Sequence, residues 1–580
     1  MVMRFLLRNR GWLYRDSGQS GGPKTSTSLQ IRQHIYLISL WLLWKTIGWE
    51  KRLLSGGWKR SKTYAVQDTL PPLPVPKLRD TFRRYLDSVR PIWPSDKCEE
   101  MVQLITELGA AGGAGERLQR ELVRRARHLR MQSSWIEAWW EKEHLLKSRL
   151  PLPVFGNWYG LDRPDTPCMS QSLRAAWLSL GAVRFHRHLS REKLEPLRMM
   201  SVVPLCMNQY KGVFNTCRIP CKNVDELHTW DCPSPFGPST VPQIPQLRRS
   251  SPTESPLTPR GTPGGTFLRG GEKVPHLAVM SRGQLYTMDL FHADGISLTV
   301  EEIQQQLETI LEMSKRAQAG HDAQAPIGIL TTEERDTWAR LRGKLIEAHQ
   351  DNQQALHAVE SAMFLLVLEG ACPEAIEDQA KTMFLGDGRN RWYDKSFQLI
   401  VFENACAGVN VEGSWADAPV ASHLFGFMHD HENMARFANR SSPNLNPATA
   451  GAGADKLSPR LAPPKKLTWR LTSELAEGMD RAQIHFDALA DRTDLHVMHM
   501  RYFGKGFIKK CQMSPDAFVQ MALQLAYYRT TGQIHLMVET AHTRQFLHGR
   551  TELVRSVSSD SVAFIKAMAH LDTGAADTKL

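Results

Sequence analysis

Apolar side chains recur at helical spacing in the middle of the chain. Between Glu301 and Met313 they stand at Ile303, Leu307, Ile310 and Leu311, on one face of a helix. From Glu333 to Leu368 we predict a long helical stretch. These patterns predict a helix-rich central region.

Other segments follow strand patterns. The run Phe397–Phe402 predicts a buried strand that turns at Glu403-Asn404 and Gly408 into a second strand, Val409–Val411. Ile534–Val538 predicts a third strand. Ser514 is a good N-cap, with Pro515 at the first position of the next helix. Strands alternating with helices indicate the α/β class.

Two segments have the composition of loops. Cys232–Glu272 is rich in Pro, Ser, Thr and Gly, so it buries too little apolar surface to fold alone. We expect it to be disordered and dispensable for folding. Arg440–Lys466 contains Ser442-Pro443, Asn446-Pro447 and Pro463-Pro464 and is predicted to join two lobes.

The positive charge is concentrated at the N-terminus. The net charge is +12, and residues 1–62 hold twelve Lys or Arg and two acids. That segment therefore carries +10 and leaves about +2 for the remainder, which makes a nucleic-acid-binding face improbable. The arginine-rich start favours a mitochondrial transit segment or an anionic membrane surface, and a solvated basic tail is the alternative.

An apolar span, Ile35–Trp49, lies within this basic region. It contains Lys45 and is shorter than the roughly 20 apolar residues that a membrane-spanning helix needs. Its three tryptophans suit the headgroup layer, so we expect an interfacial helix. A buried amphipathic helix fits the pattern equally well.

The cysteines and histidines predict no metal site. The nine cysteines include no CxxC pair, and no histidine stands near Cys217 and Cys221 at zinc-ligand spacing. Reduced thiols in a cytosol-facing protein are the simplest interpretation.

The segment Glu412–Pro419 carries the strongest functional signal. It resembles the active-site motif of the carnitine/choline O-acyltransferase family, in which a histidine starts the motif and an acid follows four residues later. Asp417 matches the acid, but Gly413 stands in place of the histidine. Further family motifs occur in order along the chain: Leu70–Pro76, Arg84–Leu86, Trp139–Glu141, Phe214–Pro220, Arg391–Phe397 and Gly504–Cys511.

In detail the chain is most similar to the type-one carnitine palmitoyltransferases of the outer mitochondrial membrane. The resemblance implies a two-lobed coenzyme-A-dependent acyltransferase fold. We expect a basic region at 1–66, an N-terminal lobe at 67–435 containing the 232–272 insert, and an incomplete C-terminal lobe at 436–580. Relative to that subfamily, the chain is expected to start after two membrane-spanning helices. The implied location is the cytosolic face of the outer mitochondrial membrane.

The family's reaction needs a general base. Acyl transfer from a thioester to the carnitine hydroxyl requires removal of a proton, a step worth about 10²- to 10⁴-fold in rate. Gly413 has no side chain, and Asp417 is a weak base because an unperturbed aspartate pKa is about 3.9. His423, His429 and His431 are the nearest alternatives, and we expect each to be a surface or core residue.

The resemblance also implies substrate contacts. Coenzyme A, as the thioester substrate and not as a bound cofactor, would be held by Lys505, Lys509 and Lys510 around a glycine loop. The helix capped by Ser514 would follow, with Asp516 near the adenosine end. Thr551 matches a carnitine contact.

Val538 replaces a family tyrosine that binds the carnitine carboxylate, and the family's oxyanion-binding Ser-Thr-Ser motif and carboxylate-binding arginine are not found. The implied partners are therefore long-chain acyl-CoA, carnitine and a membrane surface.

Three interpretations remain open. The chain is a carnitine palmitoyltransferase that transfers long-chain acyl groups for mitochondrial fatty acid import. Alternatively, it is a catalytically inactive acyl-CoA-binding sensor or scaffold, or a truncated product that does not fold stably. Gly413 favours the second and third over the first.

Overall fold

The computed structural model describes residues 62–130, 132–162, 169–230, 275–320, 323–440 and 461–575. The predicted insert at 232–272 and the apolar span Ile35–Trp49 lie outside these residues. Within the described residues, no helix combines the length and the apolar character needed to cross a bilayer.

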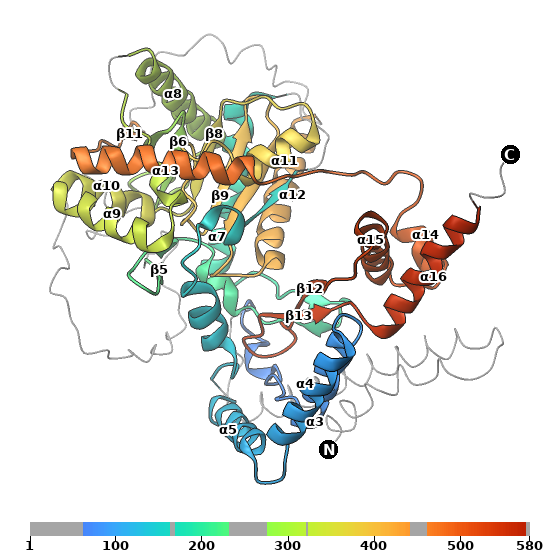
Figure 1. Cartoon of the computed structure of the whole chain (residues 1–580). Coiled ribbons are helices and arrows are strands. Elements are labelled where there is room, and N and C mark those ends of the chain that lie inside the picture. Colours follow the sequence, from blue (N-terminus) through green and yellow to red (C-terminus); the bar gives the residue numbers. More distant parts are fainter. Residues whose placement is uncertain are drawn as a thin grey trace.

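A seven-stranded mixed sheet forms the centre of the protein (Figure 1). Its order is β1-β10-β9-β8-β6-β7-β11, and only the β9-β8 and β8-β6 pairs are parallel. The strands are β1 (Asn157–Leu161), β6 (His276–Ser281), β7 (Gln284–Asp289), β8 (Leu365–Glu369), β9 (Phe397–Phe402), β10 (Ala407–Glu412) and β11 (Lys465–Lys466). The α/β class is confirmed.

Helices cover both faces of this sheet, so its central strands are buried on two sides. Along β8, Leu366 and Leu368 join one apolar cluster, whereas Leu365 and Val367 join the other. The first cluster includes α7 (Gln171–Ser190), α8 (Val300–Gln318) and α12 (Ala418–Arg440). The second includes α9 (Arg335–Ala348), α10 (Gln350–Glu360), α11 (Ile376–Phe384) and α13 (Ser473–Asp491).

Two elements differ from the sequence predictions. The stretch from Glu333 to Leu368 is not one helix, because His349 adopts extended dihedrals and caps α10 by accepting a hydrogen bond from the Asp351 amide. Its apolar end forms strand β8. The strand predicted at Ile534–Val538 begins only at its last residue, since β12 is Val538–His542.

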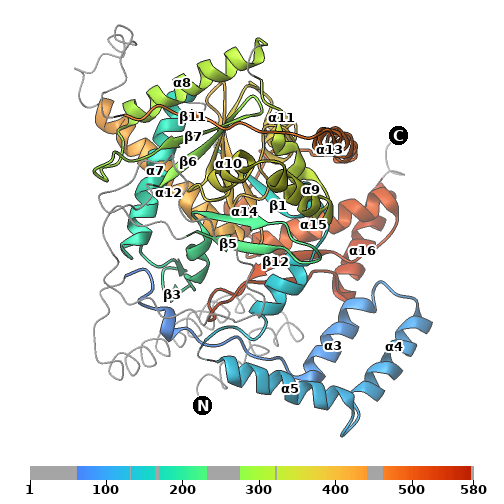
Figure 2. The ribbon, with the colours of Figure 1, turned by 90° about the vertical axis from the view of Figure 1, so that its left-hand side faces the viewer.

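The remaining elements form two smaller units and two short hairpins. α3 (Leu78–Val89), α4 (Ser95–Leu108) and α5 (Ala114–Leu129) lie together at the end of the molecule away from the sheet (Figures 1 and 2). The C-terminal unit, residues 497–575, contains α14 (Lys505–Lys510), α15 (Pro515–Thr531), β12, β13 (Thr551–Arg555) and α16 (Ser559–Ala575). The hairpins pair β2 (Arg198–Met199) with β3 (Val203–Pro204) and β4 (Thr216–Ile219) with β5 (Glu226–Thr229).

The C-terminal unit is sparsely packed. Its buried apolar side chains are few, and Tyr502 is 95% exposed. We expect the free energy of the local opening that allows amide hydrogen exchange to be lower in α15 than in β8 and β9, by roughly 2 kcal/mol or more. Hydrogen-exchange mass spectrometry under native conditions measures this difference. Equal protection of α15 and the central strands would contradict it.

Candidate active site

Strand β10 ends one residue before Gly413, the position of the family histidine, and a backbone carbonyl fills the space beside that glycine. The Gly413 amide donates a hydrogen bond to the Gly156 carbonyl at 3.1 Å. A β-carbon added to Gly413 would lie 2.8 Å from that same oxygen, a separation that real β-carbons almost never show. The turn at 152–156 therefore leaves no room for a side chain at Gly413 without a backbone shift.

That turn has an unusual backbone. It consists of α6 (Leu152–Phe155), an irregular element in which Val154 has φ +71°, and of Gly156. A β-branched residue at positive φ is strained, and such strain persists only where the surroundings enforce it. Leu152 is buried and its carbonyl accepts from the Gly156 amide at 2.8 Å. These contacts hold the Gly156 carbonyl against Gly413.

Asp417, the acid of the motif, already has partners. Its Oδ2 accepts from Gln209 Nε2 at 2.8 Å, and the Gln209 side-chain oxygen in turn accepts from the Asp417 amide at 3.0 Å. Its Oδ1 accepts from Arg550 Nε at 3.3 Å. Arg550 is buried and also donates to the Ser414 carbonyl at 3.0 Å. Both carboxylate oxygens are thus hydrogen-bonded, one to a guanidinium and one to an amide, and no imidazole is present at 413.

A buried charge network anchors the turn after β10. Ser414 donates from its amide and its hydroxyl to Glu412 Oε2, at 3.0 and 2.6 Å. Arg218 donates to the other Glu412 oxygen at 3.1 Å and to Asp225 at 2.7 Å. Because an unpaired buried charge is costly, this chain of partners fixes the Gly413 segment in one position.

The network continues through Arg335, the first residue of α9. Its guanidinium lies 2.7 Å from Asp225 Oδ2 and 2.7 Å from Asp394 Oδ1. Burial raises the pKa of Asp394 to about 6, although Arg335 opposes that shift. For Asp225 the two arginines outweigh burial, and its pKa is lowered.

The histidines considered from the sequence are used elsewhere. His423 Nδ1 is hydrogen-bonded to the Tyr210 hydroxyl at 2.8 Å, and burial lowers the pKa of His423. His429 lies 3.2 Å from Asp162 and 3.3 Å from Glu432. Burial lowers the pKa of His431 to about 4. None of these contacts joins a histidine to Asp417, which agrees with their expected structural roles.

One histidine that the sequence patterns did not single out is His542, the last residue of β12. It pairs with Thr551 across the β12-β13 hairpin, and its Nδ1 is buried with no hydrogen-bond partner among the described residues. Burial and Arg544 lower the pKa of His542, whereas the charge of Asp417 raises it. The charge of Asp417, the acid of the motif, therefore acts on the His542 imidazole. Only the fold brings these two distant parts of the chain together, so local spacing gave no signal.

The proposed coenzyme A lysines lie on a helix and not in a glycine loop. Gly504 has extended dihedrals and precedes α14, whose buried Ile508 anchors it. Lys505 and Lys509 are four residues apart, so they share one exposed face of α14. The predicted cap is confirmed, because Ser514 Oγ accepts from the Ala517 amide at 3.4 Å. Lys510 is also exposed.

Asp516, in the first turn of α15, interacts with Glu539 of β12. Partial burial and the charge of Asp516 raise the pKa of Glu539. The start of α15 therefore lies close to the β12-β13 hairpin. The predicted phosphate-binding and carnitine-binding segments therefore meet at this point.

The two predicted carnitine positions lie at opposite ends of that hairpin. Thr551 faces His542 and directly follows Arg550, which places it beside the Asp417 cluster. Val538 pairs with Arg555 and is 50% exposed. Four residues of extended strand separate the ends, which is about 13 Å. The structure thus brings Thr551, but not Val538, to the Gly413 segment.

No metal centre occurs among the described residues, where no cluster of three or more His, Cys, Asp or Glu side chains has a suitable arrangement. The candidate site is therefore built from Asp417, His542, Arg550 and Thr551 around the Gly413 turn.

The α/β fold and the Glu412–Pro419 segment both agree with the family that the sequence resembles. Residues 73–580 match the choline/carnitine O-acyltransferase family model, and the chain belongs to that family. It is 32% identical to the human liver isoform of carnitine O-palmitoyltransferase 1 over 580 residues, which cover 98% of this chain and 64% of that relative.

The human muscle isoform is also 32% identical, over 577 residues and with the same two coverages. Human carnitine O-acetyltransferase is 32% identical over 520 residues, 88% of this chain and 73% of that protein. The chain thus spans just under two thirds of the palmitoyltransferases that it resembles.

Proposed function

We propose that this chain binds long-chain acyl-CoA in the manner of its family but does not transfer the acyl group to carnitine at the family's rate. It would then act as an acyl-CoA-dependent sensor or scaffold. The observation that carries this proposal is the Gly156 carbonyl, which occupies the space beside Gly413 where a catalytic side chain would start.

The chemistry explains why this loss is decisive. In the family reaction the carnitine hydroxyl oxygen forms a bond to the thioester carbonyl carbon, its proton passes to a base, and the coenzyme A thiolate leaves and takes up a proton. Without a base near the hydroxyl, the oxygen remains a poor nucleophile, which lowers the rate by about 10²- to 10⁴-fold. Asp417 cannot replace the histidine easily, because both of its side-chain oxygens already accept hydrogen bonds, from Arg550 and Gln209.

A second candidate function is residual carnitine acyltransfer with His542 as the base. Its unpartnered, buried Nδ1 and its position opposite Thr551 favour this candidate. A base must be neutral, and burial lowers the pKa of His542, so the imidazole is in the required form at neutral pH. Turnover by this route would fall as the pH is lowered through the histidine pKa and would disappear in His542→Gln.

Binding of acyl-CoA is tested at the lysines of α14. We expect Lys505→Ala and Lys509→Ala each to weaken palmitoyl-CoA binding by up to about fivefold, because exposed charge pairs contribute at most about 1 kcal/mol. Isothermal titration calorimetry should show a larger loss at low salt than at high salt. Lys315→Ala, an exposed lysine of α8, is the matched control. Unchanged affinity in both α14 variants would exclude this role.

The location at the cytosolic face of the outer mitochondrial membrane also stays a proposal, supported by the similarity to the palmitoyltransferases. The basic N-terminal region provides the charge for an anionic surface. Fractionation of cells expressing the full chain, followed by protease treatment of intact mitochondria, tests it directly.

A further inference from the structure

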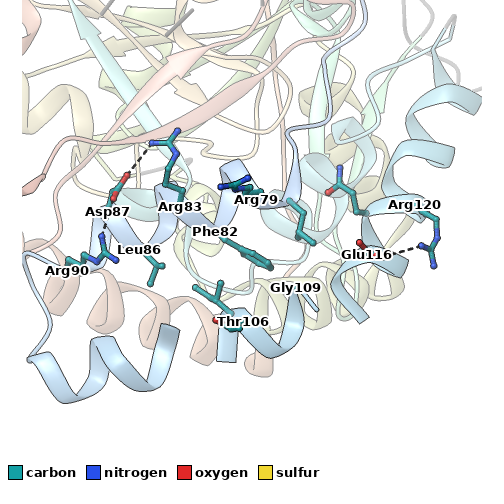
Figure 3. Close-up of a pocket in the computed structure, with 13 residues that line it drawn as sticks. Arg79, Phe82, Arg83, Leu86, Asp87, Arg90, Thr106, Gly109, Glu116 and Arg120 are labelled. Carbon is teal, nitrogen blue, oxygen red and sulfur yellow. Dashed lines mark hydrogen bonds and ion pairs between the residues drawn. The ribbon is translucent and has the colours of Figure 1, made fainter. Parts of the chain in front are cut away.

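The helices α3, α4 and α5 enclose a groove that is separate from the Gly413 segment. Its volume is about 840 Å³, and its apolar lining consists of Leu78, Phe82, Leu86 and Ile105. Phe82 points toward Gly109 and Thr106 at the end of α4 (Figure 3). All four apolar side chains are only partly buried, so the groove presents apolar surface to solvent.

Two rows of side chains follow α3 along this groove. Leu78, Phe82 and Leu86 are spaced four residues apart and form an apolar row about 12 Å long. Arg79 and Arg83 lie one residue further on and form a cationic row beside it. The apolar row and the cationic row are therefore parallel to each other along α3. This arrangement fits an amphipathic helix, which carries the same two rows.

The groove has an excess of positive charge. Its lining contains four arginines, Arg79, Arg83, Arg90 and Arg120, and two acids, a difference of +2. Asp87 is shared by Arg83 at 3.5 Å and Arg90 at 3.8 Å, and Arg120 lies 3.9 Å from Glu116. These distances are long and the partners exposed, and Arg79 makes no ion pair with the described residues. The occupant should therefore be acidic.

Helix α4 is acidic and so has the charge expected of the occupant. It carries Asp96, Glu99, Glu100 and Glu107 against a single Lys97, a net charge of −3. None of its residues is buried. Leu104 and Leu108 are 49% and 40% exposed and are spaced four residues apart. Because 100° separates successive residues of a helix, Glu100 and Glu107 lie on the side of α4 turned away from Ile105. The helix is thus under-packed on an acidic face.

We propose that α4 of a second copy of this chain docks into the groove, forming a two-fold dimer. In such a dimer each copy supplies one groove and one α4, so both contacts form at once. Leu104 and Leu108 would cover Phe82 and Leu86, and the α4 carboxylates would approach Arg79 and Arg83. Both surfaces belong to one small unit, formed by α3, α4 and α5, at the end of the molecule away from the sheet (Figures 1 and 2).

The first test measures the oligomeric state of the full chain by analytical ultracentrifugation. We expect a reversible dimer that weakens as salt is raised, because the proposed contact is ionic. The groove variant Arg79→Glu with Arg83→Glu should raise the dissociation constant at least about tenfold, since like charges across an interface repel strongly. The α4 variant Glu100→Lys with Glu107→Lys should do the same. Arg84→Glu is the control, because Arg84 is exposed on α3 but does not line the groove.

The second test mixes the two double variants. Under this proposal each double variant is monomeric on its own. In a dimer of the groove variant glutamates would face the α4 carboxylates at both contacts, and in a dimer of the α4 variant lysines would face the groove arginines at both contacts. In the mixed pair, the glutamates introduced into one groove would meet the lysines introduced into the partner's α4. The other contact would keep its original arginines and carboxylates. Mixing should therefore restore dimers, a result that misfolded variants cannot give.

Three results would overturn the proposal: a wild-type chain that stays monomeric at high concentration, a dimer unaffected by either double variant, or no heterodimer on mixing. Binding of a monomeric chain to phosphatidylserine vesicles, lost in the groove variant, would assign the groove to anionic lipid instead.

Discussion

Gly413→His should destabilise the protein by about 1 to 3 kcal/mol, the usual effect of forcing extra atoms into a packed site. The reason is the Gly156 carbonyl, 2.8 Å from where the new β-carbon would stand. Gly413→Ala should carry a large part of this cost. Gly343→Ala is the control, because nothing lies within 4 Å of its new β-carbon in α9. That change should stabilise the helix by about 0.5 to 1 kcal/mol.

The same Gly413→His substitution should not restore normal acyltransfer. Asp417 is held by Gln209 and Arg550, so it is not available to orient a new imidazole. Val538 also lacks the hydroxyl expected at the carnitine carboxylate. Groups that act as a unit are strongly non-additive, and restoring one member recovers little. Urea denaturation and a carnitine acylation assay on the same preparation measure both parts. A stable, active Gly413→His protein would contradict them.

Arg335→Met should lower the free energy of unfolding by about 3 to 5 kcal/mol, because it leaves two buried carboxylates without their shared cation. Arg335 is fully buried between Asp225 and Asp394. Arg340→Met is the control, since Arg340 is half exposed and 3.2 Å from Glu474. Its loss should cost at most about 1 kcal/mol.

The effect of Arg335→Met should depend on pH. Burial raises the pKa of Asp394 to about 6 in the folded protein, above its ordinary value of 3.8. For an acid with a raised pKa, the cost of burying the charge is present above the folded pKa and disappears below the unfolded pKa. Without Arg335, which lowers this pKa, the folded pKa of Asp394 rises above 6, and the unfolded value cancels between the two proteins. The destabilisation should therefore be largest above that higher pKa and shrink as the pH falls to about 6, below which Asp394 is protonated in both folded proteins. Denaturation curves at a series of pH values show this, and a pH-independent loss would argue against Asp394 as the cause.

Local patterns predicted the elements whose buried residues follow one clear period. The strands at Phe397–Phe402 and Val409–Val411, the helix around Glu301–Met313 and the Ser514 cap were all found. The prediction of a long helical stretch over Glu333–Leu368 was wrong at its apolar end. A short apolar run fits a buried strand as well as a helix, and periodicity does not distinguish them. The glycines around Lys505 suggested a loop, but a buried Ile508 was enough to fix a helix there.

The candidate site was predictable only in part. The sequence motif located Gly413 and Asp417, but it did not show what occupies the space left by a missing histidine. The strained 152–156 turn places the Gly156 carbonyl there, and the loop between β12 and β13 brings Arg550 to Asp417. Those contacts depend on long-range packing, which no local pattern encodes. The functions of the individual substrate-binding residues stay predictions.

The most direct test of the proposed loss of catalysis is the formation of radiolabelled palmitoylcarnitine from palmitoyl-CoA and labelled carnitine by the unmodified full chain. An active carnitine O-palmitoyltransferase assayed in parallel provides the positive control, and calorimetry on the same sample confirms palmitoyl-CoA binding. We predict bound palmitoyl-CoA and no product above background. Sustained turnover would contradict that prediction, and its loss in His542→Gln would then identify His542 as the base.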